Sequence, residues 1–493
     1  MKAATQNRQT KIIATLGPAT DDLKVLTRLI AAGADVLRIN TSHGTPEDQL
    51  ARARLVREAA SNAGREVALL VDLQGPKIRV ESFRKEFVEL KPGQTFVLDA
   101  SPEPELGDEH SVGVTYKGLA RDVEPNDVLL LDDGLITLRV VEVDGPRVIC
   151  EVETGGRLSS RKGINLKGGG LSIPGIAERD REDILRAAEM EADYVAVSFP
   201  RNAEDMEQAR RLLCDAGSHA CLVAKIERTE ALENLEEIIE ASHAVLVARG
   251  DLGVEIGDAE LPAIQKHIIR KALDQNRIVI TATQMMQSMV ESPIPTRAEV
   301  LDVANAVIDG TDAVMLSAET AVGKHPVTVI EAMHRVCLGA ERHVGTLAEQ
   351  RPLNVRFQRI DQAIASAAMF LTTNVRVDAI IALTESGSTA QWLSRVRSSV
   401  PIYALSPLAV SRRRMALYRD VYPIPHVPQG KKMEKVLRNV IRLLLDQGRI
   451  KVGDRVILTM GDRLANEGGT NTMRFVQVAD EGIAEGQNQL ELG

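Results

Sequence analysis

Residues Cys221–Gly253 read CLVAKIERTEALENLEEIIEASHAVLVARGDLG. The apolar runs at 222–227 and 244–249 predict two buried strands, because both runs are too continuous for strands with one face in water. Leucine and isoleucine residues recur at helical spacing between the two runs, which predicts a connecting helix. The segment is therefore one strand–helix–strand unit with parallel strands.

Charged side chains gather where both of these strands end. Lys225 and Glu227 are two residues apart, so they face the same side of the first strand. Arg249 and Asp251 close the second strand, with Gly250 allowing a tight bend. Glu227 and Asp251 are suited to share a divalent metal, with Lys225 beside an anion bound to it. The alternative is a purely structural cluster of ion pairs at the rim of a barrel.

The same alternation of strand and helix extends on both sides of this segment. Three strands are predicted before it, at 10–17, 35–40 and 66–73, and three more at 194–199, 278–283 and 313–317. Eight strand–helix units in about 250 residues are typical of a (β/α)8 TIM barrel. We expect that α/β barrel to comprise residues 1–72 and 171–345.

Two further regions depart from this pattern. Residues 73–170 alternate short strand-like runs with turns, which predicts an inserted β-barrel-like lid domain after the third strand. Residues 346–493 contain further strands and helices and predict a separate C-terminal α/β domain.

Composition excludes several classes of partner. The chain has 493 residues, a net charge of −9 and a pI near 5.7, which argues against nucleic acid and against an anionic membrane. Its four cysteines show no zinc-binding spacing and fit a reducing compartment. The chain shows neither an apolar segment near its start nor an apolar run of about 18 residues, so we expect a cytoplasmic protein.

Other predicted strand ends add anion-binding side chains. Arg38, Asn40 and Ser42 share one face as long as the chain stays extended, and an arginine there suits a phosphate. Thr281 and Thr283 share a face in the same way. The sequence contains no GxxxxGK[ST] loop, no GxGxxG and no Ser-His-Asp arrangement. The residues alone leave two chemistries open, metal-dependent phosphoryl transfer and stabilisation of an enolate.

A family resemblance narrows this choice. The chain contains, in order, TKIIATLGPAT, LRINTSHG, GPKIR, LLDDGLI, KGINL, VAVSFP, VAKIER, VARGDLGVEI, TATQMMQSM, PTRAEVLDVANAV and DAVMLSAETAVGKHP. These motifs span about residues 10–330 and resemble pyruvate kinase, as does the later TNTMRFVQV. The resemblance implies phosphoryl transfer from phosphoenolpyruvate to ADP, which gives pyruvate and ATP in glycolysis.

The resemblance also implies roles for individual residues. Glu227 and Asp251 would hold Mg2+ or Mn2+, while Lys225 and Arg38 neutralise the transferring phosphoryl group. Backbone N–H groups at 249–251 (Arg249, Gly250 and Asp251) would hold the substrate carboxylate with Thr283, which would also help to deliver the final proton. The nucleotide would lie between barrel and lid, near Thr15, Pro18, Asn40, His43, Arg79 and Lys162.

The chain departs from the family where many members bind K+. The matching positions are Asn40, Ser42, Asp72 and Leu73, and the last is usually threonine. Lys77 stands where those members carry glutamate. We expect the Lys77 ammonium to take the place of the cation, so that K+ is not required.

The C-terminal domain offers a candidate effector site. Thr384, Glu385, Ser386, Gly387, Ser388 and Thr389 lie between a predicted strand and a predicted helix, where backbone N–H groups suit a phosphate. The alternative is an ordinary helix cap. The resemblance favours the bacterial type that responds to sugar monophosphates or AMP, and it implies a homotetramer.

Two rival interpretations remain at the level of sequence. A mutase or aldolase barrel that handles phosphoenolpyruvate or an enolate would need no lid of about a hundred residues. A regulatory pseudokinase would normally have lost Lys225 or one of the two carboxylates.

Overall fold

The computed structural model describes residues 8–344, 357, 359–398, 400–427, 433–461, 469–480 and 482–483. It divides into two compact units. One contains the described residues up to Ile39, Ala51–Leu70 and those from Met285 onward, and the other contains Asn40–Leu50 and Val71–Gln284. The expected boundary between barrel and C-terminal domain, at 345–346, lies outside the described residues, as do residues 1–7.

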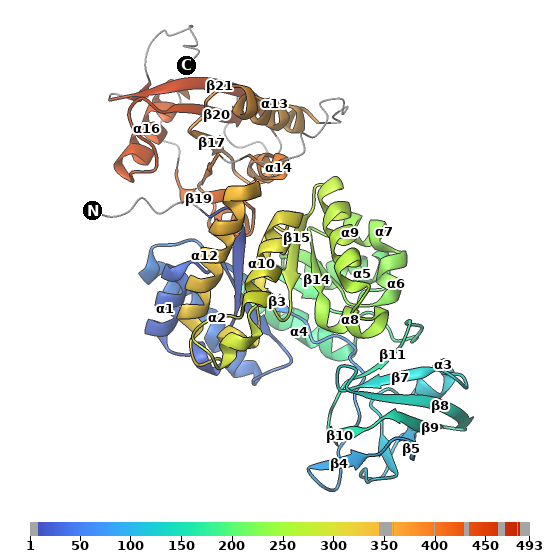
Figure 1. Ribbon diagram of the computed structural model, residues 1–493. Coiled ribbons are helices and arrows are strands. Elements are labelled where there is room, and N and C mark those ends of the chain that lie inside the picture. The colour runs from blue at the N-terminus through green and yellow to red at the C-terminus, as the bar shows by residue number, and fades with distance from the viewer. Residues whose placement is uncertain are drawn as a thin grey trace. The chain divides into compact units, whose positions relative to one another are not determined.

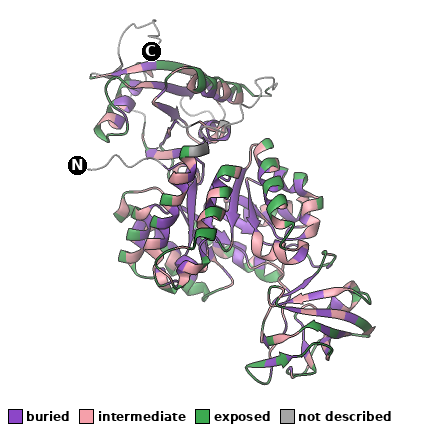
Figure 2. Cartoon of the chain, in the orientation of Figure 1, coloured by how far each residue is buried: buried purple, intermediate pink, exposed green. Residues whose placement is uncertain are grey.

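Eight strands form a closed barrel in the order β1-β16-β15-β14-β13-β12-β3-β2 (Figure 1). The predicted TIM barrel, with three strands before the insertion and five after it, is confirmed. The strands are β1 (Lys11–Thr15), β2 (Val36–Asn40), β3 (Ala68–Asp72), β12 (Tyr194–Val197), β13 (Cys221–Ile226), β14 (Ala244–Ala248), β15 (Ile278–Ala282) and β16 (Ala313–Leu316). They are buried almost throughout, as their purple colour in Figure 2 shows.

Helices connect the barrel strands, and their outer faces are exposed (Figure 2). Helix α1 illustrates how the sequence sets the ends of these helices. Asp22 caps its start by accepting hydrogen bonds from the N–H groups of Lys24 and Val25, and Gly33 ends it at φ +130°. The helices are α1 (Leu23–Ala32), α2 (Pro46–Ala63), α4 (Glu178–Glu189), α5 (Ala203–Asp215), α6 (Thr229–Glu233), α7 (Leu235–Glu240), α8 (Arg249–Ile256), α9 (Leu261–Asp274), α10 (Arg297–Asp309), α11 (Ala318–Ala321) and α12 (Pro326–Val344), with 3-10 turns η1 (Pro18–Thr20) and η2 (Gln287–Val290).

The opening segment differs from its prediction in two places. Its connecting helix is divided at Asn234 into α6 and α7. The second strand ends at Ala248, and Arg249 already begins helix α8, so Asp251 lies in the first turn of a helix and not at a strand end. The spacing of apolar residues predicts where strands and helices lie. It does not mark the residue at which a strand ends and a helix begins, because the apolar pattern continues across that point.

The insertion is the predicted β domain, built around its own apolar core. Its main sheet has the order β11-β7-β8-β9-β5-β6, and β10 pairs with β4 in a second, two-stranded sheet. The elements are β4 (Phe87–Leu90), β5 (Thr95–Asp99), β6 (Ser111–Gly113), α3 (Leu119–Asp122), β7 (Val128–Leu131), β8 (Ile136–Asp144), β9 (Arg147–Thr154), β10 (Gly156–Ser159) and β11 (Ile164–Leu166).

The C-terminal region forms the predicted α/β domain, with a mostly parallel sheet in the order β19-β18-β17-β20-β21-β22. Its strands are β17 (Ala379–Leu383), β18 (Ile402–Ser406), β19 (Val421–Pro425), β20 (Arg455–Gly461), β21 (Thr470–Ala479) and β22 (Gly482–Ile483). Its helices are α13 (Ile360–Asn374), α14 (Ser388–Val396), α15 (Ala409–Met415) and α16 (Met433–Asp446). Helix α16 packs five buried apolar residues into the core of this domain.

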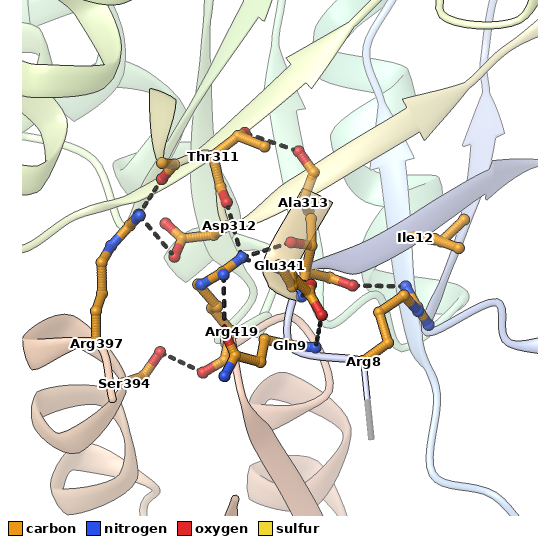
Figure 3. Close-up of polar contacts among 12 residues, drawn as sticks. Arg8, Gln9, Ile12, Thr311, Asp312, Ala313, Glu341, Ser394, Arg397 and Arg419 are labelled. Carbon is orange, nitrogen blue, oxygen red and sulfur yellow. Dashed lines mark hydrogen bonds and ion pairs between the residues drawn. The ribbon is translucent and has the colours of Figure 1, made fainter. Parts of the chain in front are cut away.

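Within the first unit, buried polar contacts join this domain to the barrel (Figure 3). Arg395 at the end of α14 makes two hydrogen bonds of 2.7 Å to the carboxylate of Asp312, which precedes β16. Arg419 donates to the side chain of Gln9, and its own carbonyl accepts from Ser394. The contact between the C-terminal domain and the barrel is therefore stabilised by a buried ion pair as well as by packing.

None of the helices in the described part of the chain is both long enough and apolar enough to span a bilayer.

Candidate active site

Lys225 lies at the centre of a cluster of polar side chains at the carboxyl ends of the barrel strands. Its Nζ is 2.9 Å from Glu227 Oε1 and 3.3 Å from Asp72 Oδ1, and it donates to Ser198 Oγ at 2.8 Å. These residues end or follow β13, β3 and β12, which are neighbours in the barrel. Parallel strands bring their carboxyl ends to one rim, which is why residues far apart in sequence meet here.

Glu227 is a buried carboxylate with few contacts to water. It is 1% exposed, and its Oε2 accepts the backbone N–H of Phe199 at 2.9 Å. Burial is the main cause that raises the pKa of Glu227 to about 7, and the charges of Asp251 and Asp72 add to it, while Lys225 opposes the shift.

Asp251 faces a second lysine. Lys77 Nζ lies 2.6 Å from Asp251 Oδ1, and the two side chains are only 21% and 22% exposed. Among the described residues, no group of three or more His, Cys, Asp or Glu is arranged to hold a metal ion. The two carboxylates nevertheless suit Mg2+, which is commonly held by one or two carboxylates together with substrate phosphates and water. Each carboxylate already attracts positive charge, since each has a lysine ammonium against it.

Thr283, Arg249 and Gly250 form a second set of contacts at the same rim. The N–H of Gly250 donates to Thr283 Oγ1 at 2.9 Å, and Arg249 Nε donates to the carbonyl of Ala282 at 3.0 Å. The expectation that Thr281 and Thr283 share a face of an extended strand is wrong, because β15 ends at Ala282 and Thr283 has φ +67°. This left-handed turn directs the Thr283 hydroxyl to the start of α8.

Arg38 lies in the other compact unit, near the end of β2. It is buried, and its Nη1 donates to Thr15 Oγ1 at 3.0 Å. Thr15 in turn donates to the carbonyl of Leu316 at 2.7 Å, and Pro18 begins the 3-10 turn that follows β1. Three of the predicted residues, Arg38, Thr15 and Pro18, thus occupy neighbouring stretches of that unit.

Two of the residues expected near a nucleotide line one cleft of about 720 Å³ in the second unit. Its wall includes His43 and Arg79, together with Ser42 and Arg161. Lys162 instead pairs with Asp132 at 2.7 Å within the lid. Three arginines, Arg79, Arg161 and Arg179, line the cleft together with two glutamates, Glu81 and Glu105, so positive charge is in slight excess.

The residues expected to surround a monovalent cation make contacts with other side chains and with the main chain. Asn40 Oδ1 accepts the N–H of Ser42 at 3.0 Å, and Leu73 is buried and apolar. Asp72 lies against Lys225, whereas the Lys77 ammonium lies against Asp251.

The candidate effector segment is a tight turn before α14. Thr384 Oγ1 accepts the N–H of Gly387 at 3.0 Å, and Ser406 Oγ donates to the carbonyl of Glu385 at 2.9 Å. Gly387 has φ +93°, and a Cβ there would come within 2.9 Å of Met415. Thr389 contacts Thr470, while Ser386 and Ser388 complete the turn. The turn is therefore held by the hydroxyls of Thr384 and Ser406, while Gly387, the N-cap residue of α14, provides no side-chain hydrogen bond to the helix.

Sequence reasoning missed Ser198 and Phe199 as members of the Lys225 cluster. The available signal was their place directly after a barrel strand, which is the position that marked Glu227 and Asp72.

Comparisons with known proteins agree with this fold. Residues 7–330 match the family model described as "Pyruvate kinase, barrel domain", and residues 362–476 match "Pyruvate kinase, alpha/beta domain". The chain is 52% identical to pyruvate kinase II of Salmonella typhimurium over 96% of this chain and 99% of the relative. It is 40% identical to a pyruvate kinase of Geobacillus stearothermophilus over 97% of this chain and 82% of the relative. A crystal structure of a pyruvate kinase from Cryptosporidium parvum superposes with a TM-score of 0.87 at 32% identity, covering 95% of this chain and 96% of that one. Sequence motifs, barrel topology and these matches together establish that the chain belongs to the pyruvate kinase family of phosphotransferases.

Proposed function

We propose that this chain transfers the phosphoryl group of phosphoenolpyruvate to ADP at the Lys225–Glu227–Asp251 cluster, in the cytoplasm. The observation that carries the proposal is the buried ammonium of Lys225, held 2.9 Å from Glu227 at the rim of the barrel. Phosphoryl transfer needs positioning and stabilisation of charge more than covalent chemistry from the protein, and this cluster provides preorganised charge.

Individual roles follow from the positions of the side chains. Lys225 neutralises charge on the transferring group, and Arg38 assists it from the end of β2. Arg249, Gly250 and Asp251 present backbone N–H groups at the start of α8 for the substrate carboxylate, with the Thr283 hydroxyl beside them. ADP occupies the cleft lined by His43 and Arg79. Asn40, Thr15, Pro18 and Lys162 are the other residues proposed to contact the nucleotide.

Glu227 and Asp251 would hold Mg2+ or Mn2+. Such an ion supplies charge neutralisation for the phosphate and for the enolate oxygen. The support is the chemistry of the donor set: two carboxylates at one rim, each beside a cation.

Pyruvate formation from phosphoenolpyruvate and ADP, measured in a lactate-dehydrogenase-coupled assay, tests this proposal. We expect activity with Mg2+ or Mn2+ and at least a hundredfold loss in EDTA, because a divalent ion would supply charge neutralisation directly at the phosphate and the enolate oxygen. Adding excess Mg2+ back should restore the rate, which controls for irreversible damage by the chelator. Full activity in EDTA would refute the metal requirement, and absence of pyruvate under all conditions would refute the function.

K+ independence is a further part of the proposal. Leu73 provides no side-chain ligand, and the Lys77 ammonium adds a fixed positive charge at Asp251. In tetramethylammonium buffer we expect less than about twofold activation by 100 mM KCl, since the fixed ammonium replaces the mobile ion.

The variant Lys77→Glu provides the matched comparison for this prediction. Its activity in tetramethylammonium buffer should fall and then rise with added K+, whereas the unmodified chain should respond little. Strong activation of the unmodified chain by K+ would contradict the assignment to Lys77.

Regulation and assembly complete the proposal. The turn Thr384–Thr389 would bind a phosphorylated effector, a sugar monophosphate or AMP, and calorimetric titration with each compound tests this. A homotetramer is proposed from the resemblance to the family, and light scattering after size exclusion measures the mass. We also propose the domain division 1–72 with 171–345, 73–170 and 346–493.

A further inference from the structure

Ser198 and Phe199 form a corner directly after β12, and both contact the proposed catalytic cluster. Ser198 is 1% exposed. Phe199 has φ +56°, a conformation that costs free energy in a residue with a bulky side chain. A strained conformation at this place is maintained only where surrounding contacts determine it.

The hydroxyl of Ser198 has one proton to donate, and its nearest acceptor is a main-chain carbonyl. Ser198 Oγ donates to the carbonyl of Leu73 at 2.8 Å, which is the nearer of its two acceptors, since Asp72 Oδ1 lies at 3.5 Å. A hydroxyl that donates to a carbonyl must present a lone pair to its other neighbour. That neighbour is the Nζ of Lys225 at 2.8 Å, so Lys225 is the donor and its ammonium meets a fixed acceptor.

The backbone of the corner serves the second member of the cluster. The N–H of Phe199 donates to Glu227 Oε2 at 2.9 Å, while Glu227 Oε1 faces Lys225. The corner therefore fixes the position of the ammonium through a side chain and that of the carboxylate through the main chain.

Close packing holds the corner in place. Gly75, at φ +70°, lies so close that a Cβ on it would come within 2.5 Å of Ser198 Cβ and 3.0 Å of Phe199 Cδ2. The N–H of Gly75 donates to Asp180 Oδ1 at 2.9 Å, which anchors the opposite side of this contact to α4. The acceptor for Lys225 is thus part of a rigid wall and not a mobile surface group.

We propose that Ser198 is a positioning residue for Lys225, and this inference rests on the proposed function of Lys225. Of the three oxygens within 3.3 Å of the ammonium that are described above, two belong to carboxylates and one to Ser198. Glu227 is a candidate metal ligand, and a bound ion would compete with the Lys225 ammonium for its charge. The neutral Ser198 hydroxyl stays on the ammonium throughout and keeps it aimed at the phosphoryl group.

The variant Ser198→Ala tests the inference through the split between kcat and KM. We expect kcat to fall about tenfold to a hundredfold, the loss associated with a hydrogen bond to a charged group. KM for phosphoenolpyruvate and for ADP should change by less than threefold, because the hydroxyl is proposed to aim the ammonium and not to bind substrate.

A double-mutant cycle with Lys225→Met separates positioning from general structural damage. If Ser198 acts through Lys225, Ser198→Ala should lower kcat by less than threefold in the Lys225→Met background. An equal loss in both backgrounds would overturn the inference while leaving the proposed function of Lys225 intact. If Lys225→Met alone retained its kcat, the proposed function would fail together with the inference.

Ser242→Ala is the matched control. Ser242 is also buried, and its hydroxyl donates to a carbonyl, that of Ile238, at 2.7 Å. Loss of that hydroxyl should leave kcat within twofold. If Ser198→Ala does not fold, Ser198→Cys replaces it, because the thiol has a similar shape but accepts hydrogen bonds weakly. It should lose at least fivefold in kcat, and an unchanged kcat would overturn the inference.

Discussion

Replacing Lys225 with methionine is expected to lower kcat by on the order of a thousandfold while the chain still folds. Methionine has a similar length, so the space beside Ser198 remains filled. The substitution removes the ammonium that lies against two carboxylates, Glu227 and Asp72. Since the charge of Lys225 lowers the pKa of Glu227, its removal leaves burial and the neighbouring carboxylates to raise that pKa further.

Steady-state kinetics in the coupled assay measure the loss of kcat, and circular dichroism shows whether the variant still folds. Lys271→Met is the control, because Lys271 lies on the outer helix α9 and pairs with the exposed Glu236. The control should keep kcat within twofold. A Lys225→Met enzyme that retained more than a tenth of the original kcat would exclude the role given to this lysine.

The second large effect concerns stability and not catalysis. Replacing Arg395 with methionine is expected to lower the free energy of unfolding by about 3–5 kcal/mol, the cost of leaving one member of a buried ion pair behind. Arg395 and Asp312 are 1% and 0% exposed, and their two hydrogen bonds of 2.7 Å have the paired geometry of a guanidinium on a carboxylate. Without Arg395, the buried carboxylate keeps the more distant Arg397, at 3.9 Å.

Tryptophan fluorescence during urea denaturation measures this loss directly. The chain has a single tryptophan, Trp392, on the same helix as Arg395. Arg376→Met is the control, because Arg376 is 78% exposed in its pair with Asp378 and should contribute less than about 0.5 kcal/mol. The double variant Arg395→Met with Asp312→Leu should recover most of the loss. A single variant as stable as the original chain would show that the pair is not required.

The barrel was predictable because its strands are buried on both faces and its helices repeat between them. Those two features produce continuous apolar runs and helical periodicity, and both survive in a single sequence. Local backbone geometry was not predictable in the same way. Thr283 and Phe199 adopt left-handed conformations that their residue types rarely take, and Asp251 begins a helix where an extended strand was expected.

Some of the polar contacts could be predicted from the sequence and others could not. Lys225 and Glu227 are two residues apart on one strand, so their meeting follows from the period of a strand. The contact of Ser198 with Lys225 depends on how neighbouring strands align, which no local pattern encodes. Arg395 and Asp312 are 83 residues apart and meet only because the C-terminal domain docks on the barrel.

The first described residues of the chain have a consequence for its synthesis. Lys11 Nζ donates to the carbonyl of Val421 at 2.6 Å, across 410 residues, and the carbonyl of Gln9 accepts the N–H of Asp420 at 2.9 Å. A ribosome releases the amino end of the chain long before residue 420 exists. Lys11 and the carbonyl of Gln9 therefore lack these hydrogen-bond partners during most of translation, and water solvates both groups until the C-terminal domain has been synthesised.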